Sequence, residues 1–251
     1  MRHSPLRHTP AVLVAGATAL VAFTTPGARA AGPAAQTADH YVALGDSYSA
    51  GNGAFSTNLD VGCNRNTYAY PYLVSQQRPN TALTFVACGG ATTTDVNNNQ
   101  LSALTSSTKF VTITIGGNDI GFVNLLVSCW SYNDDAMCQS AADTANGKIA
   151  NQLGAALDGT YARIKAASPT ATVVVLGYPN PPGSNLTCAA ADGISTANRT
   201  SIGSVVNNPE SKIGDRAAAA GFTYKSAIAP VQRPRRVRHR PVGQRQVSVA
   251  G

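Results

Sequence analysis

The sequence has 251 residues, and its 19 basic and 12 acidic side chains give a formal net charge of +7. A basic protein of this kind often binds nucleic acid, but here all twelve acids and only nine of the basic residues lie between residues 31 and 224. The body of the chain is therefore mildly acidic, and we expect no nucleic-acid partner. The chain that follows the first 30 residues is long enough for one sizeable domain.

The first 30 residues have the three-part pattern of a secretory signal peptide. Two arginines and no acid occupy the first ten positions, an apolar run follows from Ala11 to Phe23, and small residues surround Arg29. This pattern predicts cleavage after Ala30 and a secreted, extracellular protein. The apolar run is shorter than the ~20 residues that span a bilayer, so we expect no stable membrane insertion. An uncleaved anchor is the alternative.

Residues 31–39 form a predicted flexible leader, and residues 40–224 a single predicted domain in which short apolar runs alternate with helical spacing. In chain order we expect a strand at His40–Leu44, a helix at Tyr68–Gln77, strands at Ala82–Cys88 and Phe110–Ile115, a helix at Ala141–Ala167, a strand at Thr172–Leu176, a helix at Thr196–Ala220 and a strand at Phe222–Tyr224. Pro209 should break or kink the last helix. This alternation predicts an α/β fold, a three-layer α/β/α sandwich around a mostly parallel sheet.

Three loops that follow successive predicted strands carry residues suited to acyl transfer. Ser47 lies on a tight turn after the first strand, Gly89-Gly90 follow the second, and Asn118 follows Gly116-Gly117 after the third. Ligands of open parallel sheets bind beyond the carboxyl ends of the strands. A serine hydroxyl with two neutral donors, the Gly90 N–H and the Asn118 amide, makes an oxyanion site. Each motif alone is weak evidence: Gly-Asp-Ser is a common turn, Gly-Gly after a strand is more often a plain loop, and Gly-Gly-Asn-Asp is also typical of a turn or a helix cap.

The chain has five cysteines, and an exported protein normally pairs them. Cys129 and Cys138 are close enough to bridge one local loop, and Cys63 with Cys88 would tie the loop after Ser47 to the end of the second strand. Cys188 is then unpaired. Because no second close pair or histidine partner accompanies them, we expect no zinc or other metal site.

Three segments together resemble the GDSL, or SGNH, hydrolase family, in its secreted actinobacterial esterase and lipase branch: Tyr41–Ser49, Ala87–Val96 and Thr112–Phe122. The resemblance implies a flavodoxin-like SGNH fold, with Ser47 as nucleophile and its own N–H, the Gly90 N–H and Asn118 as the oxyanion hole. It assigns Asp46 a structural role outside the triad. It also implies hydrolysis of small or lipid esters without a cofactor, and we expect a monomer.

The family's catalytic histidine, near the C-terminus in Asp-x-x-His or Phe-x-Gly-His, has no counterpart here. His3 and His8 leave with the signal, and His40 lies at the far end of the first strand from Ser47, roughly 23 Å away for an extended strand. His239 stands in an arginine-rich run that resembles nothing in the family. No catalytic histidine is therefore identified, although a serine needs a base.

The tail from residue 225 to 251 is aberrant, with seven basic residues and no acid. We interpret it as a frame-shifted reading of the missing block. Codons can be chosen so that Val231–Arg245, read one base later, gives Phe-Ser-Gly-His-Gly-Val-Cys. The alternatives are a solvated, disordered end and a patch for anionic partners. Three functions follow: an active ester hydrolase, a catalytically impaired product of the same fold, and a secreted binding protein with a basic tail.

Overall fold

A computed structural model describes residues 38–179 and 193–228. Its centre is a five-stranded sheet in the order β4-β1-β5-β6-β7, and every neighbouring pair is parallel. The strands are β1 (Asp39–Gly45), β4 (Thr81–Phe85), β5 (Phe110–Thr114), β6 (Thr172–Leu176) and β7 (Thr223–Lys225). All five predicted strands are therefore present, in the predicted parallel arrangement.

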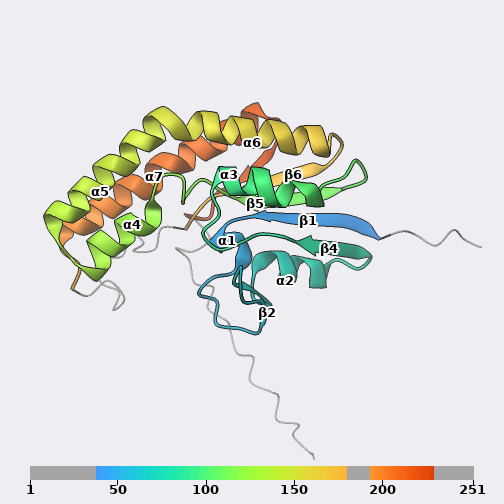
Figure 1. The fold of residues 1–251 in the computed structure, drawn as a ribbon, viewed down its shortest axis with the longest axis horizontal. Coiled ribbons are helices and arrows are strands. Elements are labelled where there is room, and N and C mark those ends of the chain that lie inside the picture. The colour runs from blue at the N-terminus through green and yellow to red at the C-terminus, as the bar shows by residue number, and fades with distance from the viewer. Residues whose placement is uncertain (1–37, 180–192, 229–251) are drawn as a thin grey trace, which may run out of the picture. The chain divides into compact units, whose positions relative to one another are not determined.

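Helices flank the sheet, with α2 on one side and α6 on the other (Figure 1). The helical segments are α1 (Ser47–Ala50), α2 (Tyr70–Gln77), α3 (Thr93–Asp95), α4 (Phe122–Leu126), α5 (Asp135–Lys148), α6 (Gly154–Ala167) and α7 (Thr196–Ala219). Short π or 3-10 turns continue several of them: η1 (Val96–Gln100), η2 (Leu101–Ala103), η3 (Val127–Ser131) and η4 (Ile149–Leu153). The predicted α/β fold with a mostly parallel sheet is confirmed.

A small antiparallel hairpin of β2 (Asn58–Asp60) and β3 (Arg65–Asn66) lies outside the main sheet. The residues that pack the core are those that strand and helix periodicity place inward. Val42, Val111 and Ile113 in the central strands are fully buried, as are Leu157 and Ile164 of α6. None of the helices in the described ranges has the length and apolar character needed to cross a membrane.

Three predicted boundaries were wrong by two residues or more. The strand expected at Ala82–Cys88 ends at Phe85, because the N–H groups of Val86 and Ala87 both donate to the carbonyl of Ala43, which interrupts regular pairing. The helix expected from Tyr68 begins at Tyr70, since the Tyr68 N–H is held by the side chains of Ser56 and Asn66.

The helix expected from Ala141 begins six residues earlier, at Asp135, because Asp134 caps it by accepting from the Met137 N–H at 2.8 Å. Helix α7 also continues through Pro209, where a break was a predicted outcome. Pro209 is buried together with Val205 and Val206 on the inner face of α7. The burial of this face offsets the one hydrogen bond that proline removes.

Candidate active site

Ser47 lies directly beyond the carboxyl end of the central strand β1, as the first residue of the short helix α1. Asp46 caps this helix by accepting from the N–H of Tyr48 at 3.0 Å. The Asp46 N–H donates to the carbonyl of Thr114 at 3.0 Å, which fixes the turn to the end of β5. Ser47 itself is half-buried, and its hydroxyl has no hydrogen-bond partner among the described residues.

The loop after β4 carries Gly89 and Gly90 and is anchored at two points. The Cys88 N–H donates to the carbonyl of Gly45 at 2.9 Å, and the Gly89 N–H donates to the carbonyl of Cys63 at 2.9 Å. Gly90 is exposed and has a φ of +84°. This left-handed conformation favours glycine, and no atom lies within 4 Å of the position a Cβ would take. A ligand can therefore approach the Gly90 backbone closely.

The loop after β5 carries Asn118, which is half-buried. Its Nδ2 donates to the carbonyl of Ala91 at 2.9 Å, so the loops after β4 and β5 are joined directly. Asp119 strengthens the junction by accepting from the Thr93 hydroxyl at 2.5 Å and from its N–H at 3.1 Å. An amide nitrogen carries two hydrogens, so Asn118 retains one donor for a ligand.

Adjacent strands hold these three loops, because β1 lies between β4 and β5 in the sheet. Ser47, Gly90 and Asn118 therefore extend from the same edge of the sheet, on loops tied to one another by the hydrogen bonds described above. The arrangement offers one hydroxyl and two neutral donors at the edge where α/β folds bind ligands. The roles of these three residues stay a prediction.

Asp46 has a partner that the sequence did not reveal. The carboxylate is buried and accepts from the hydroxyls of Tyr178 and Thr114, the latter at 2.7 Å. Burial raises the pKa of Asp46 to about 6, although these hydrogen bonds and that of the Tyr48 N–H favour the ionised form. Burial, together with the neighbouring Asp46 charge, also raises the pKa of Tyr178, so its phenol stays protonated. Asp46 therefore holds the turn that bears Ser47 from within the core, in accord with the structural role expected for it.

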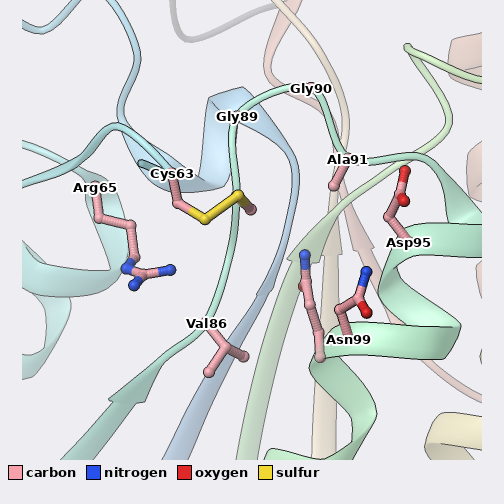
Figure 2. A pocket seen from close by; sticks show the side chains of 10 residues that line it. Cys63, Arg65, Val86, Gly89, Gly90, Ala91, Asp95 and Asn99 are labelled. Atoms are coloured by element: carbon pink, nitrogen blue, oxygen red, sulfur yellow. A yellow bond between two sulfur atoms is a disulfide. The ribbon is translucent and has the colours of Figure 1, made fainter. Parts of the chain in front are cut away.

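A cavity of about 520 Å³ opens beside Gly90 (Figure 2). Arg65 lies on one side of the Gly89–Gly90 segment, and Asp95 and Asn99 lie on the other. The residues that line the cavity are Cys63, Arg65, Val86, Cys88, Gly89, Gly90, Ala91, Asp95, Asn99 and Gln100. Arg65 is paired with Asp60 at 2.5 Å, so its charge is already neutralised. Ser47 and Asn118 do not line this cavity.

His40 is the one histidine in the part of the chain that the structure describes. Its Nε2 lies 2.9 Å from the Thr84 hydroxyl and its Nδ1 lies 3.3 Å from the Thr108 hydroxyl. It stands near the amino end of β1, whereas Ser47 follows the carboxyl end. His40 is therefore remote from Ser47, as expected. His3, His8 and His239 lie outside the described residues.

Both predicted disulfides are present, Cys63–Cys88 and Cys129–Cys138. Cys188 lies outside the described residues, so its free thiol stays a prediction. Within residues 38–179 and 193–228, no group of three or more histidine, cysteine or acidic side chains is arranged to hold a metal ion.

Comparison with known proteins identifies the family. Residues 43–237 match the GDSL-like Lipase/Acylhydrolase family. The chain belongs to this family of carboxylic ester hydrolases. It is 42% identical over 214 residues to Lipase 1 of Streptomyces coelicolor (strain ATCC BAA-471 / A3(2) / M145), covering 85% of this chain and 76% of that lipase. It is 38% identical over 222 residues to a lipase of Streptomyces rimosus, covering 88% and 78%.

Solved structures agree with this assignment. The phospholipase A1 from Streptomyces albidoflavus NA297 matches with a TM-score of 0.68 at 38% identity, over 74% of this chain and 78% of the other. The extracellular lipase from Streptomyces rimosus matches with a TM-score of 0.71 at 36% identity, over 76% and 81%. The expected resemblance to GDSL hydrolases and the expected fold class are both confirmed.

Proposed function

We propose that this GDSL-family chain is a secreted serine hydrolase that cleaves carboxylic esters through an acyl-enzyme on Ser47. One observation carries the proposal. The Ser47 hydroxyl is free of hydrogen bonds within the described residues and extends from the strand that lies between those bearing the Gly90 and Asn118 loops. A nucleophile must present its oxygen to the substrate carbonyl, whereas a serine that only stabilises a turn uses its hydroxyl within that turn. Activation of the oxygen still requires a base.

In this mechanism the Ser47 oxygen attacks the ester carbonyl and gives up its proton, the bond to the alcohol oxygen breaks, and the departing alkoxide takes up that proton and leaves as the alcohol, which forms the acyl-enzyme. The negative oxygen of the tetrahedral intermediate accepts from the N–H groups of Ser47 and Gly90 and from the Asn118 side chain. Water then attacks the acyl group and releases the acid. Removal of one such donor typically costs 10²–10³-fold in kcat, because donors of this kind act mainly on the transition state.

The names of the relatives support the substrate class and the location. The similar proteins are called lipases and a phospholipase A1, and one is described as extracellular. We therefore propose that esters of lipids or short acyl groups are the substrates, and that the N-terminal 30 residues export the chain. The two disulfides are consistent with an oxidising compartment.

A second candidate is a catalytically impaired member of the same family. The observation that favours it is the position of His40, the histidine in the described residues, which is bound by Thr84 and Thr108 at the far end of β1. Without a base, an oxyanion site and substrate binding retain only ~10³–10⁴-fold acceleration over water.

The test is hydrolysis of p-nitrophenyl butyrate by the full chain and by Ser47→Ala. The matched control is Ser106→Ala, an exposed serine without a hydrogen bond of its side chain among the described residues. We expect the full chain to hydrolyse the ester at an enzymatic rate, Ser47→Ala to abolish this activity and Ser106→Ala to retain it. Equal rates for the full chain and Ser47→Ala would overturn the proposal.

Added imidazole separates the two candidates, because it can supply the missing base from solution. In an impaired enzyme, imidazole should raise the rate of the full chain well above that of Ser47→Ala measured in the same buffer. In a fully active enzyme, the rate without imidazole is already high and the additional rate is small. The Ser47→Ala reaction corrects for direct hydrolysis of the ester by imidazole.

A further inference from the structure

Tyr178 joins the two loops that carry the proposed nucleophile and the proposed oxyanion donor. It lies two residues after the end of β6 and is 9% exposed. Its hydroxyl donates to Oδ2 of Asp46, the residue before Ser47. The same oxygen accepts from the N–H of Gly117 at 3.0 Å, the residue before Asn118. One phenol oxygen thus connects the neighbours of both functional residues.

The ring of Tyr178 fills the space between the same two loops. It meets the ring of Tyr48, the residue after Ser47, edge-on with centroids 5.1 Å apart and planes at 81°. On the other side it lies so close to Gly117 that a Cβ there would come within 3.2 Å of the ring carbon that bears the hydroxyl. The side chain is therefore packed tightly against both loops.

The chemistry of the two partners explains why a tyrosine suits this position. The ionised carboxylate of Asp46 can only accept a hydrogen bond, and the backbone N–H of Gly117 can only donate one. A direct bond between them would pull the loops together, so a group that bridges them at a greater separation must both donate and accept a hydrogen bond. The protonated phenol does both while its ring sets the spacing.

We propose that Tyr178 is a positioning residue, which holds the turn bearing Ser47 and the loop bearing Asn118 at the separation that ester hydrolysis requires. The inference rests on the proposed function of Ser47 and Asn118, and it assigns to Tyr178 no contact with the substrate. We expect loss of this positioning to lower kcat and not to raise KM, because an oxyanion donor acts mainly when negative charge develops on the carbonyl oxygen in the transition state.

Loss of the Tyr178 hydroxyl should leave the fold intact. Asp46 keeps its hydrogen bonds from Thr114 at 2.7 Å and from the Tyr48 N–H at 3.0 Å. The Gly117 N–H, in contrast, loses its acceptor, and the Asn118 loop gains freedom. A displacement of about 1 Å in a catalytic group can cost about 10²-fold in rate, so we expect Tyr178→Phe to lower kcat by about 10- to 100-fold with little change in KM.

Tyr161→Phe is the matched control. Tyr161 is fully buried in the same core, and its hydroxyl has no hydrogen-bond partner among the described residues. Both variants delete one buried phenol oxygen, but only Tyr178→Phe removes a link between the two loops. Steady-state hydrolysis of p-nitrophenyl butyrate should therefore leave Tyr161→Phe close to the unmodified chain in kcat and KM.

Hydrogen exchange followed by mass spectrometry supplies a measurement that does not need turnover. Tyr178→Phe should speed exchange in the peptide covering residues 116–122 relative to the unmodified chain, whereas Tyr161→Phe should not. If the unmodified chain shows no Ser47-dependent hydrolysis, the proposed function fails, and the exchange result still decides whether Tyr178 holds the loop. Equal exchange in the two variants, or a loss confined to KM, would overturn the inference.

Asp46→Asn is a second variant, for use if Tyr178→Phe does not fold. It preserves the shape of the residue and an oxygen for Thr114 and Tyr48, but it leaves the Tyr178 hydroxyl proton without a carboxylate to accept it. The same fall in kcat and the same faster exchange at residues 116–122 are expected. Normal kcat in a folded Asp46→Asn chain would contradict the proposed link.

Discussion

The side-chain amide of Gln100 forms two hydrogen bonds with the backbone of Gly45, the last residue of β1. Oε1 accepts from the Gly45 N–H at 2.7 Å and Nε2 donates to the Gly45 carbonyl at 2.9 Å. Gly45 has a φ of +121°, and a Cβ there would lie 2.4 Å from the carbonyl oxygen of Thr114. The buried amide therefore satisfies the backbone at the point where β1 leaves the sheet, two residues before Ser47.

We expect Gln100→Met to destabilise the protein by about 2–4 kcal/mol. The substitution leaves the buried Gly45 N–H without an acceptor and removes one hydrogen-bond donor from the Gly45 carbonyl. Urea unfolding of the two chains measures this difference. The control is Asn98→Met, an exposed position in the same π turn whose side chain has no hydrogen bond among the described residues. A loss below about 1 kcal/mol for Gln100→Met would show that the two hydrogen bonds contribute little.

Two exposed helix glycines offer a route to higher stability. Gly147 in α5 and Gly159 in α6 have open space where a Cβ would stand. Alanine is favoured over glycine in a helix by about 1 kcal/mol, so Gly147→Ala and Gly159→Ala should each raise the free energy of unfolding by about 0.5–1 kcal/mol. Gly154→Ala is the contrasting control, because its Cβ would meet the Arg216 side chain at 3.3 Å. The melting temperature of Gly154→Ala, measured by thermal unfolding, should be lower than those of the other two variants.

The fold could be predicted because its strands are short apolar runs that end at glycine or proline turns. Phe110–Thr114 is the central example, with a β-branched residue at every position after the phenylalanine. The same reasoning missed the helical segment at residues 93–103, whose run of threonine and asparagine has low helix propensity. A signal was present: Thr92 and Asp95 form a capping box, which a search for helix starts would find.

The candidate site was only partly predictable for a different reason. Three of its residues each follow a strand: Ser47, Gly90 and Asn118. Because a parallel sheet places the carboxyl ends of its strands at one edge, the local sequence pattern was sufficient to predict that these residues lie there. Tyr178 contacts Asp46 across 132 residues of sequence. No local pattern records such a contact, because it depends on how far β6 lies from β1 and on the length of the intervening loops.

The raised pKa of Asp46 predicts a loss of stability as the pH rises. Burial raises this pKa to about 6, whereas an unfolded aspartate titrates near 4. The folded state therefore holds the proton more tightly, and ionisation opposes folding. We expect the free energy of unfolding to fall between pH 4 and pH 6 by up to about 3 kcal/mol from this group.

Asp46→Asn cannot ionise, so urea unfolding at pH 4, 5, 6 and 7 should show a flatter profile than that of the unmodified chain. Asp143→Asn, at an exposed position in α5, is the control and should retain the decline. Parallel profiles for the unmodified chain and Asp46→Asn would show that Asp46 titrates at its ordinary pKa.

The fifth cysteine predicts one free thiol per chain. Cys63, Cys88, Cys129 and Cys138 are consumed in two disulfides, and an odd number of cysteines leaves Cys188 without an intramolecular partner. Titration of the unfolded, unreduced monomer with a thiol reagent should give one equivalent, and Cys188→Ser should give none. A monomer with no titratable thiol would contradict the assignment.

The two disulfides should differ in what their removal does. Cys63–Cys88 joins residues 25 apart in sequence, and Cys129–Cys138 joins residues 9 apart. The longer closed loop restricts the unfolded chain more, so paired Cys→Ser substitutions should cost about 3.5 kcal/mol at the first bridge and about 2.5 kcal/mol at the second. Only the first bridge anchors the Gly90 loop, where the Gly89 N–H donates to the carbonyl of Cys63. Removal of Cys63–Cys88 should therefore lower the rate of ester hydrolysis at temperatures where both variants are folded. Equal rates for the two variants would show that this disulfide does not support the candidate site.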